Sequence, residues 1–189
     1  RSRGLGDVYK RQIVDGITYL KKIGLTKIVL VGGNGAVDQL DFLKENNIPV
    51  IVSRPHRLPD NEDDDPKSAF KIASRLVNAG LLVSIDVSGS MERMNTRNLP
   101  FYAGSFAAYG LKKEIALQLI TLNPAKILGI DDLLGSLEIG KQATLFISDG
   151  DAMDMRTNII NNAFISGREI SLETHQTKLW KRYSKKHNN

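Results

Sequence analysis

Cysteine is absent from this sequence of 189 residues, and histidine occurs only three times. The lack of cysteine excludes disulfide bonds, thiolate nucleophiles and thiolate metal ligands, and it fits a reducing or an oxidising compartment equally well. No apolar run reaches the roughly 18 residues that a transmembrane helix needs, so we expect no membrane-spanning segment. The first residues also lack the apolar core of a signal peptide. The sequence leaves the location open between the cytoplasm and, if a signal peptide lies upstream, the periplasm or the exterior.

The positive charge of the chain is confined to its two ends. Of the formal net charge of +5, residues 1–12 carry +3 and residues 178–189 carry +5, which leaves −3 for the residues between them. A protein that binds nucleic acid is expected to carry its basic patch on the folded body. We therefore expect neither nucleic acid nor a membrane as a partner. Residues 172–189 are predicted to form a basic terminal helix and tail, and residues 1–12 a non-native or disordered leader, because they lack apolar periodicity.

Short apolar segments alternate with amphipathic ones from residue 13 onward. The apolar segments predict buried strands at residues 27–31, 48–53 and 81–87. Apolar residues at helical spacing predict helices at residues 13–23, 37–45, 68–79, 100–109 and 111–121. This alternation is typical of an α/β protein with a parallel sheet that helices cover on both faces. The three βα units form either a small open sheet or the last units of a larger barrel.

The second half of the chain is predicted to change from helices to short strands. Asn123 is expected to cap a helix that has Pro124 at its first position and ends at Gly129, because an asparagine side chain accepts a backbone N–H that proline does not need. Short strands are predicted at residues 136–139, 144–148 and 163–170, and a helix at residues 172–183. Trp180 is expected to anchor that helix by packing.

One stretch carries a specific family signature. Residues 111–150 read LKKEIALQLITLNPAKILGIDDLLGSLEIGKQATLFISDG. The Asn123-Pro124-Ala125-Lys126 step, the Gly135-Ser136-Leu137-Glu138 turn, Gly140-Lys141 and Asp149-Gly150-Asp151 follow one another at fixed spacing. In this order they resemble the C-terminal part of the imidazolonepropionase-like group of the amidohydrolase superfamily. Residues 163–168, AFISGR, resemble the closing strand of that family.

The resemblance implies a (β/α)8 TIM barrel joined to a small β-sandwich. Residues 13–128 would supply the last βα units of a partial barrel, and residues 129–171 the C-terminal part of the sandwich. The implied function is metal-dependent hydrolysis of a non-peptide carbon–nitrogen bond in a small-molecule substrate, such as a cyclic amide. A divalent metal, zinc by first choice, is expected in the full-length parent, whereas this chain by itself can lack one. A homo-oligomer is left open.

Four residues are candidates for the site. His56, just after the second predicted strand, is the candidate metal ligand, although a lone histidine is more often a surface or hydrogen-bonding residue. Asp86 is the candidate catalytic residue, with a structural aspartate as the alternative. Asn95 and Arg97 lie in the loop after the third strand and are candidates for substrate binding, Arg97 as a clamp for a carboxylate or as a surface arginine.

The sequence departs from the family pattern at two strand ends. Many members carry a ligand histidine where this chain has Gly32 and Gly33. An alignment on Gly80 places the family's last aspartate at Ser88, whereas Asp86 lies two residues earlier on the same strand face. These departures motivate a second hypothesis, a metal-poor homologue that binds a ligand or partner without hydrolysis. We also expect this chain alone to be inactive, because three barrel strands leave unpaired edges.

A minor alternative concerns the segment that follows the third strand. Asp86, Ser88 and Ser90, together with the later Asp149, resemble the Mg²⁺-binding adhesion motif of von Willebrand factor A domains, whose oxygen ligands suit Mg²⁺. That family places its motif on the first strand, whereas two βα units precede it here. The sequence therefore favours the amidohydrolase interpretation over a Mg²⁺-binding adhesion-type module.

Overall fold

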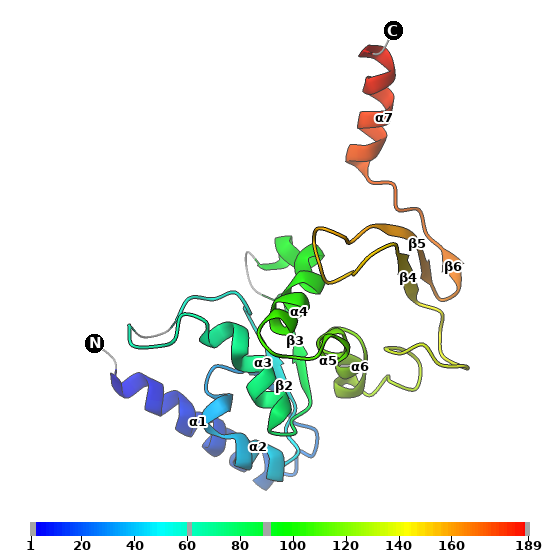
Figure 1. Ribbon diagram of the computed structural model, residues 1–189. Coiled ribbons are helices and arrows are strands. Elements are labelled where there is room, and N and C mark those ends of the chain that lie inside the picture. The colour runs from blue at the N-terminus through cyan, green and yellow to red at the C-terminus, as the bar shows by residue number, and fades with distance from the viewer. Residues whose placement is uncertain (1–2, 60–61, 89–91, 188–189) are drawn as a thin grey trace. The chain divides into compact units, whose positions relative to one another are not determined.

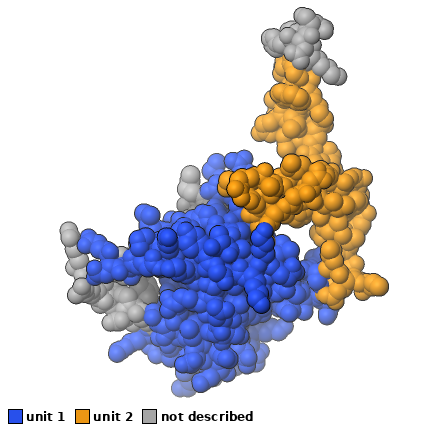
Figure 2. Space-filling model, viewed as in Figure 1, with its two compact units in different colours: residues 1–136 blue, residues 137–189 orange. Residues whose placement is uncertain are grey.

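The chain forms two compact units, residues 1–136 and residues 137–189, which Figure 2 shows in different colours. The computed structural model describes residues 3–59, 62–88 and 92–187. Within those residues, none of the helices is long and apolar enough to cross a membrane. Each unit has its own small sheet, and each is described separately below.

A parallel sheet of three short strands lies at the centre of the first unit. Its strands are β1 (Leu30–Gly32), β2 (Val50–Val52) and β3 (Val83–Ile85), in the order β1-β2-β3. Both pairs are parallel and in register, so Leu30 lies opposite Val50, and Val50 opposite Val83. The predicted parallel α/β arrangement is confirmed, with each strand shorter than the apolar segment that predicted it.

The two faces of this sheet differ in how well they are covered. One face carries the buried side chains of Val50, Val52, Val83 and Ile85. On the other face Val31 is 58% exposed, and Ile51 is half-buried. Ser84 on that face is buried, and its hydroxyl donates to the Leu119 carbonyl at the end of α5 at 3.0 Å. Within the described residues this face is therefore covered at β3 and open at β1, so the expected cover on both faces is present only in part.

The first unit has a helix at each of the predicted helical segments, and Figure 1 shows their arrangement. They are α1 (Arg3–Lys22), η1 (Ala36–Asp38), α2 (Leu40–Glu45), α3 (Ser68–Asn78), η2 (Glu92–Asn98), α4 (Leu99–Ala108), α5 (Lys113–Gln118) and α6 (Leu122–Leu128). The core consists of side chains such as Leu43, Leu76, Phe106 and Leu119, all at most 1% exposed. Burial of each such side chain stabilises the fold by about 1.5–3 kcal/mol. Helix α1 begins inside the segment 1–12.

Asn123 does not cap a helix. Helix α6 begins one residue earlier, at Leu122, after Thr121. The Asn123 side chain, 8% exposed, instead donates from Nδ2 to the Val83 carbonyl of β3 at 2.8 Å. The cap prediction is wrong because Asn123 lies within the first turn of α6, where its side chain is directed at a buried carbonyl 40 residues away in sequence.

The Gly135 position of the family signature has a steric reason. Gly135 has a φ of +96°, and a Cβ there would lie 2.8 Å from the Ala125 Cβ and 3.0 Å from the Leu122 Cα. Only glycine combines this backbone conformation with so close an approach to α6. The predicted strand at residues 136–139 does not form; a turn closes there, in which Lys141 N donates to Glu138 O at 3.2 Å.

The second unit has one antiparallel sheet and a terminal helix. Strands β4 (Leu145–Ser148), β5 (Ile160–Ile165) and β6 (Arg168–Glu169) pair in that order, and α7 spans His175–His187. The predicted strand 163–170 is therefore two strands, which reverse direction at Ser166 and Gly167, both with positive φ. Trp180 is 69% exposed, so the expectation that it anchors α7 by packing is wrong within this unit.

Candidate functional site

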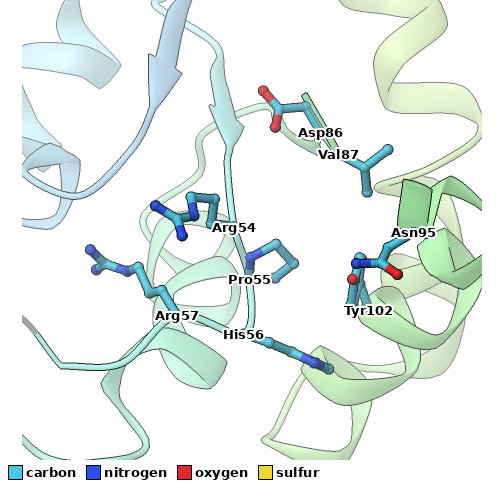
Figure 3. Close-up of a pocket in the computed structure, with 8 residues that line it drawn as sticks. All are labelled: Arg54, Pro55, His56, Arg57, Asp86, Val87, Asn95 and Tyr102. Carbon is cyan, nitrogen blue, oxygen red and sulfur yellow. The ribbon is translucent and has the colours of Figure 1, made fainter. Parts of the chain in front are cut away.

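A cavity of about 180 Å³ lies where the strands of the parallel sheet end (Figure 3). Its walls come from the loop after β2, the residues directly after β3, and η2 and α4. The lining residues are Arg54, Pro55, His56, Arg57, Asp86, Val87, Asn95 and Tyr102. Because parallel strands all end at one edge of their sheet, loops that are far apart in sequence meet here.

Three of the four predicted site residues share this cavity. His56, Asp86 and Asn95 all line it, although they come from three different segments of the chain. Arg97 is exposed in η2 and is absent from the lining. The geometry brings the first three together; the roles predicted for all four residues remain predictions.

Asp86 is held by its neighbours in a defined orientation. Its Oδ2 accepts hydrogen bonds from Ser53 Oγ at 2.8 Å and from Ser88 Oγ at 3.0 Å. Its backbone N–H donates to the Val52 carbonyl at 3.0 Å, which extends the pairing of β2 and β3 by one residue. Among the described residues, its Oδ1 accepts one long hydrogen bond, 3.3 Å, from the Ser88 N–H. One carboxylate oxygen is therefore well bonded, and the other retains most of its accepting capacity.

His56 is packed between aromatic rings beside the cavity. Its ring meets those of Phe70 and Tyr102 edge-on, with centroids 5.3 and 4.7 Å away. Partial burial lowers the pKa of His56 below its ordinary value of 6.5, because the charged form loses hydration there. The neutral ring is therefore favoured at pH 7.

A hydrogen bond joins His56 to helix α4. Its Nε2 lies 2.8 Å from Ser105 Oγ, and Ser105 Oγ lies 3.0 Å from the Phe101 carbonyl, which can only accept. Donation by Ser105 to that carbonyl favours the tautomer with the hydrogen on Nε2 and the lone pair on Nδ1. In that tautomer Nδ1 is the ring atom that can bind a metal or accept a proton.

The donor groups of the described residues do not complete a metal site. No group of three or more histidine, aspartate or glutamate side chains able to hold a metal ion occurs among them. Among the residues that line the cavity, Asp86 and His56 are the candidate metal ligands. The two arginines are excluded as ligands, because a charged guanidinium has no lone pair to donate. A metal at this edge would need further ligands from residues outside the described chain.

Several lining residues were missed by sequence reasoning. Arg54, Arg57 and Tyr102 line the cavity, and Ser53 and Ser105 hold its two candidate groups. Ser53 and Arg54 directly follow a predicted strand, which is the signal that could have found them. Gly32 and Gly33, where many members of the family carry a ligand histidine, are not among the lining residues.

Comparison with known proteins gives one consistent family. A sequence model described as "Amidohydrolase family" matches residues 15–170. An imidazolonepropionase from Syntrophobacter fumaroxidans is 35% identical over 79 residues, which are 41% of this chain and 19% of that protein. The resemblance to imidazolonepropionase-like amidohydrolases is thereby confirmed.

Solved structures show the same fold. The crystal structure of an amidohydrolase from Thermotoga maritima has a TM-score of 0.72 at 26% identity, covering 85% of this chain and 41% of that one. An adenosine deaminase from Xanthomonas campestris, solved with bound zinc, has a TM-score of 0.51 at 18% identity over 90% of this chain and 45% of that one. The chain thus spans about two fifths of the length of the structures it matches.

These findings do not favour the two alternatives drawn from the sequence. Neither a non-catalytic homologue nor an adhesion-type Mg²⁺ module is needed to explain the match. Of the adhesion-type motif, Ser90 lies outside the described residues, and Asp149 lies in the second unit, where it accepts a hydrogen bond from Asn161 Nδ2. Ser88 donates its hydroxyl to Asp86 itself.

Proposed function

The chain belongs to the amidohydrolase family, and we propose that it is the C-terminal part of a metal-dependent hydrolase that cleaves a non-peptide carbon–nitrogen bond, such as that of a cyclic amide. Because the chain spans about two fifths of the structures it matches, the activity belongs to a longer protein. The single observation that carries the proposal is the position of Asp86. It directly follows β3, lines the cavity, and exposes Oδ1 as an acceptor.

The open face of the parallel sheet supports a barrel. Val31 and Ile51 lie on that face, and Ser53 and Asp86 follow on the same face by strand alternation. In a (β/α)8 barrel this face would be the interior, and the polar residues at its carboxyl end would lie at the mouth, where barrel enzymes carry their active sites. The remaining strands would bury Val31, and the antiparallel sheet of the second unit would join a small sandwich.

The residues of this chain can perform the non-metal part of such a reaction. Asp86 can accept a proton or a substrate hydrogen bond at Oδ1, while Ser53 and Ser88 hold Oδ2 in place. Asn95 and Tyr102 offer an amide and a hydroxyl to orient a small-molecule substrate. A divalent metal, zinc by first choice, would supply Lewis acidity once the longer protein completes its ligands.

The experiment uses the intact protein that contains this chain. It is purified with zinc supplementation, its metal content is measured, and hydrolysis of a panel of cyclic amides is followed by release of the ring-opened acid. We expect Asp86→Asn to lower kcat/KM at least about a hundredfold, because an amide cannot accept the proton that the carboxylate accepts.

Asp65→Asn is the matched control for that variant. Asp65 is an exposed carboxylate that pairs with Lys71 at 2.5 Å and lies outside the cavity. Its replacement should leave kcat/KM within about twofold of the parent, since exposed ion pairs contribute little. An Asp86→Asn protein with the activity of the control, or a metal-loaded intact protein that hydrolyses none of the amides, would contradict the proposal.

A further inference from the structure

Helix α7 has an apolar side that the described residues of its unit leave largely exposed. Leu179 and Tyr183 are four positions apart, and Trp180 and Tyr183 are three apart, so the three side chains lie on one side of the helix. Their exposed fractions are 37%, 69% and 52%. The apolar side of a surface helix normally packs against a core. Here two aromatic rings and a leucine are available to a partner instead.

The opposite side of α7 is basic. Lys178, Lys181 and Arg182 are three and four positions apart, and helical geometry puts them roughly opposite the apolar side chains. Among the described residues Lys181 pairs with Glu173 at 2.9 Å, whereas Lys178 and Arg182 make no ion pair. Residues 178–189 carry a formal charge of +5 without an acidic side chain. Like charges four positions apart destabilise a helix, so an anionic partner would relieve repulsion within α7.

The start of α7 is fixed by local hydrogen bonds. Thr174 Oγ1 accepts from the Thr177 N–H at 3.2 Å, and the Lys178 N–H donates to the Thr174 carbonyl at 3.0 Å. A threonine hydroxyl in this position satisfies an N–H that the first turn of a helix leaves without a carbonyl partner. The two sides of α7 are therefore separated by its own fold, before any partner binds.

This arrangement favours an anionic lipid surface over other acidic partners. Helices that lie on membranes carry Trp, Phe or Leu on one side and Lys or Arg on the other, and Trp and Tyr rings favour the headgroup region. The phosphates of a nucleic acid would engage the basic side and leave the apolar side in water. The family match ends at residue 170, before α7 begins at His175, so the family's fold does not account for this helix.

We propose that α7 binds peripherally to a membrane surface that contains anionic phospholipids, with Leu179, Trp180 and Tyr183 at the boundary of headgroups and acyl chains. A helix with its side chains is about 10–12 Å wide. The basic side therefore stays within the roughly 10 Å over which anionic headgroups attract it. The inference is independent of the proposed function, since no residue of the cavity takes part. It differs from the expectation of no membrane partner, which rested on charge along the chain without the two-sided arrangement of α7.

The test follows the intact protein that contains this chain onto lipid vesicles by sedimentation. One set of vesicles contains equal parts of phosphatidylglycerol and phosphatidylcholine, and the other contains phosphatidylcholine alone. We expect at least about tenfold tighter binding to the anionic vesicles, because each Lys or Arg near such a surface adds about a factor of five in affinity. Added salt should weaken that binding, because it screens the attraction.

Two double variants separate the contributions of the two sides of α7. Lys178→Gln with Arg182→Gln should weaken binding to the anionic vesicles at least about tenfold, because two attracted charges are lost. Leu179→Ser with Trp180→Ser should weaken it by a similar factor of about ten, because the apolar area that enters the lipid is lost. All four positions are exposed, so the fold should be retained.

Arg75→Gln combined with Lys112→Gln is the control. Both residues are exposed in the first unit, and their replacement changes the net charge as much as the Lys178 and Arg182 double variant does. The control should bind like the parent. Equal binding to both kinds of vesicle, binding to neither, or a variant of either side of α7 that binds as well as the control would overturn the inference. Binding to double-stranded DNA or polyglutamate but not to the vesicles would overturn it too, since the partner would then be an acidic macromolecule.

Discussion

At the scale of single residues, the cavity is defined by how its polar groups are held. Asp86 and His56 each have one atom bonded to a serine hydroxyl, Asp86 to Ser53 and His56 to Ser105. Each therefore keeps a second polar atom, Oδ1 or Nδ1, for other partners. The two serines fix the orientation of the Asp86 and His56 side chains, and the second polar atom of each can contact a ligand.

Ser53 should act as a positioning residue for Asp86. Ser53→Ala removes the shorter of the two hydroxyl bonds to Oδ2, and such bonds to a charged group contribute about 1.5–3 kcal/mol. We expect kcat of the intact protein to fall about tenfold or more with KM little changed, and Ser53→Thr to restore it. Ser74→Ala, which removes a hydroxyl bonded to Lys71 O within α3, should leave kcat unchanged. Equal kcat values for the two alanine variants would exclude this role.

His56 should make stability depend on pH. Its pKa is lowered in the folded state by burial, so the unfolded chain binds more protons than the folded one between the folded pKa and about 6.5. The free energy of unfolding that depends on neutral His56 is therefore fully present above pH 6.5, and it is lost as the pH falls through the pKa of His56 in the folded state. Urea unfolding between pH 5 and pH 7.5 should show stability rising with pH, and His56→Gln should flatten that rise. If His56→Gln leaves the rise of unfolding free energy with pH unchanged, other titratable groups cause that rise.

At the scale of elements, side chains far apart in sequence connect the helices to the sheet. Helix α6 is tied to β3 by Asn123, and the loop after β2 is tied to the end of β3 by Ser53. Both bonds are made by short polar side chains at the ends of elements. The two bonds fix the positions of α6 and of the loop after β2 relative to β3, which Asp86 directly follows.

Loss of the Asn123 amide should destabilise the first unit. Asn123→Ala leaves the Val83 carbonyl without its side-chain donor in a buried place, which costs about 1–3 kcal/mol of unfolding free energy. Denaturant unfolding of this chain measures the loss. Asn78→Ala, at an exposed position of α3, should change the same quantity by no more than about 0.5 kcal/mol. Similar losses for the two variants would show that the buried bond contributes nothing.

At the scale of the whole molecule, the open sheet face is the clearest sign of a larger assembly of strands. A valine at the centre of a strand is usually buried, yet Val31 is 58% exposed, whereas Val50 on the adjacent strand and opposite face is fully buried. The proposed barrel explains the difference, since its missing strands would cover Val31 and pair the free sheet edges.

Two matched substitutions test the barrel. Val31→Thr should change the stability of this chain by no more than about 0.5 kcal/mol, because the added hydroxyl meets water. In the intact protein the same change should cost about 1–3 kcal/mol, because the hydroxyl would be buried. Val50→Thr, buried in this chain, should be costly in both. If Val31→Thr is equally mild in the intact protein, the face is not a barrel interior.

The sequence by itself determined the parts that depend on neighbouring residues. Apolar runs specified the three parallel strands, apolar spacing specified the helices around them, and the spaced Asn-Pro and glycine motifs specified the family. The same local order placed His56 and Asp86 directly after strands, and parallel strands bring such positions to one edge. That is why these two residues could be expected at one site before their contacts were known.

Only the tertiary structure decided what depends on contacts between distant segments. The local pattern of Asn123 favours a cap, but α6 begins one residue earlier and the Asn123 amide donates to the Val83 carbonyl 40 residues away. Ser53 and Asp86 are 33 residues apart, and no pattern pairs them. The left-handed backbone of Arg54 and the exposure of Val31 and Trp180 likewise follow from what surrounds each residue. Hydrogen bonds and burial are set by three-dimensional neighbours, whereas strand and helix patterns are set by periodicity along the chain.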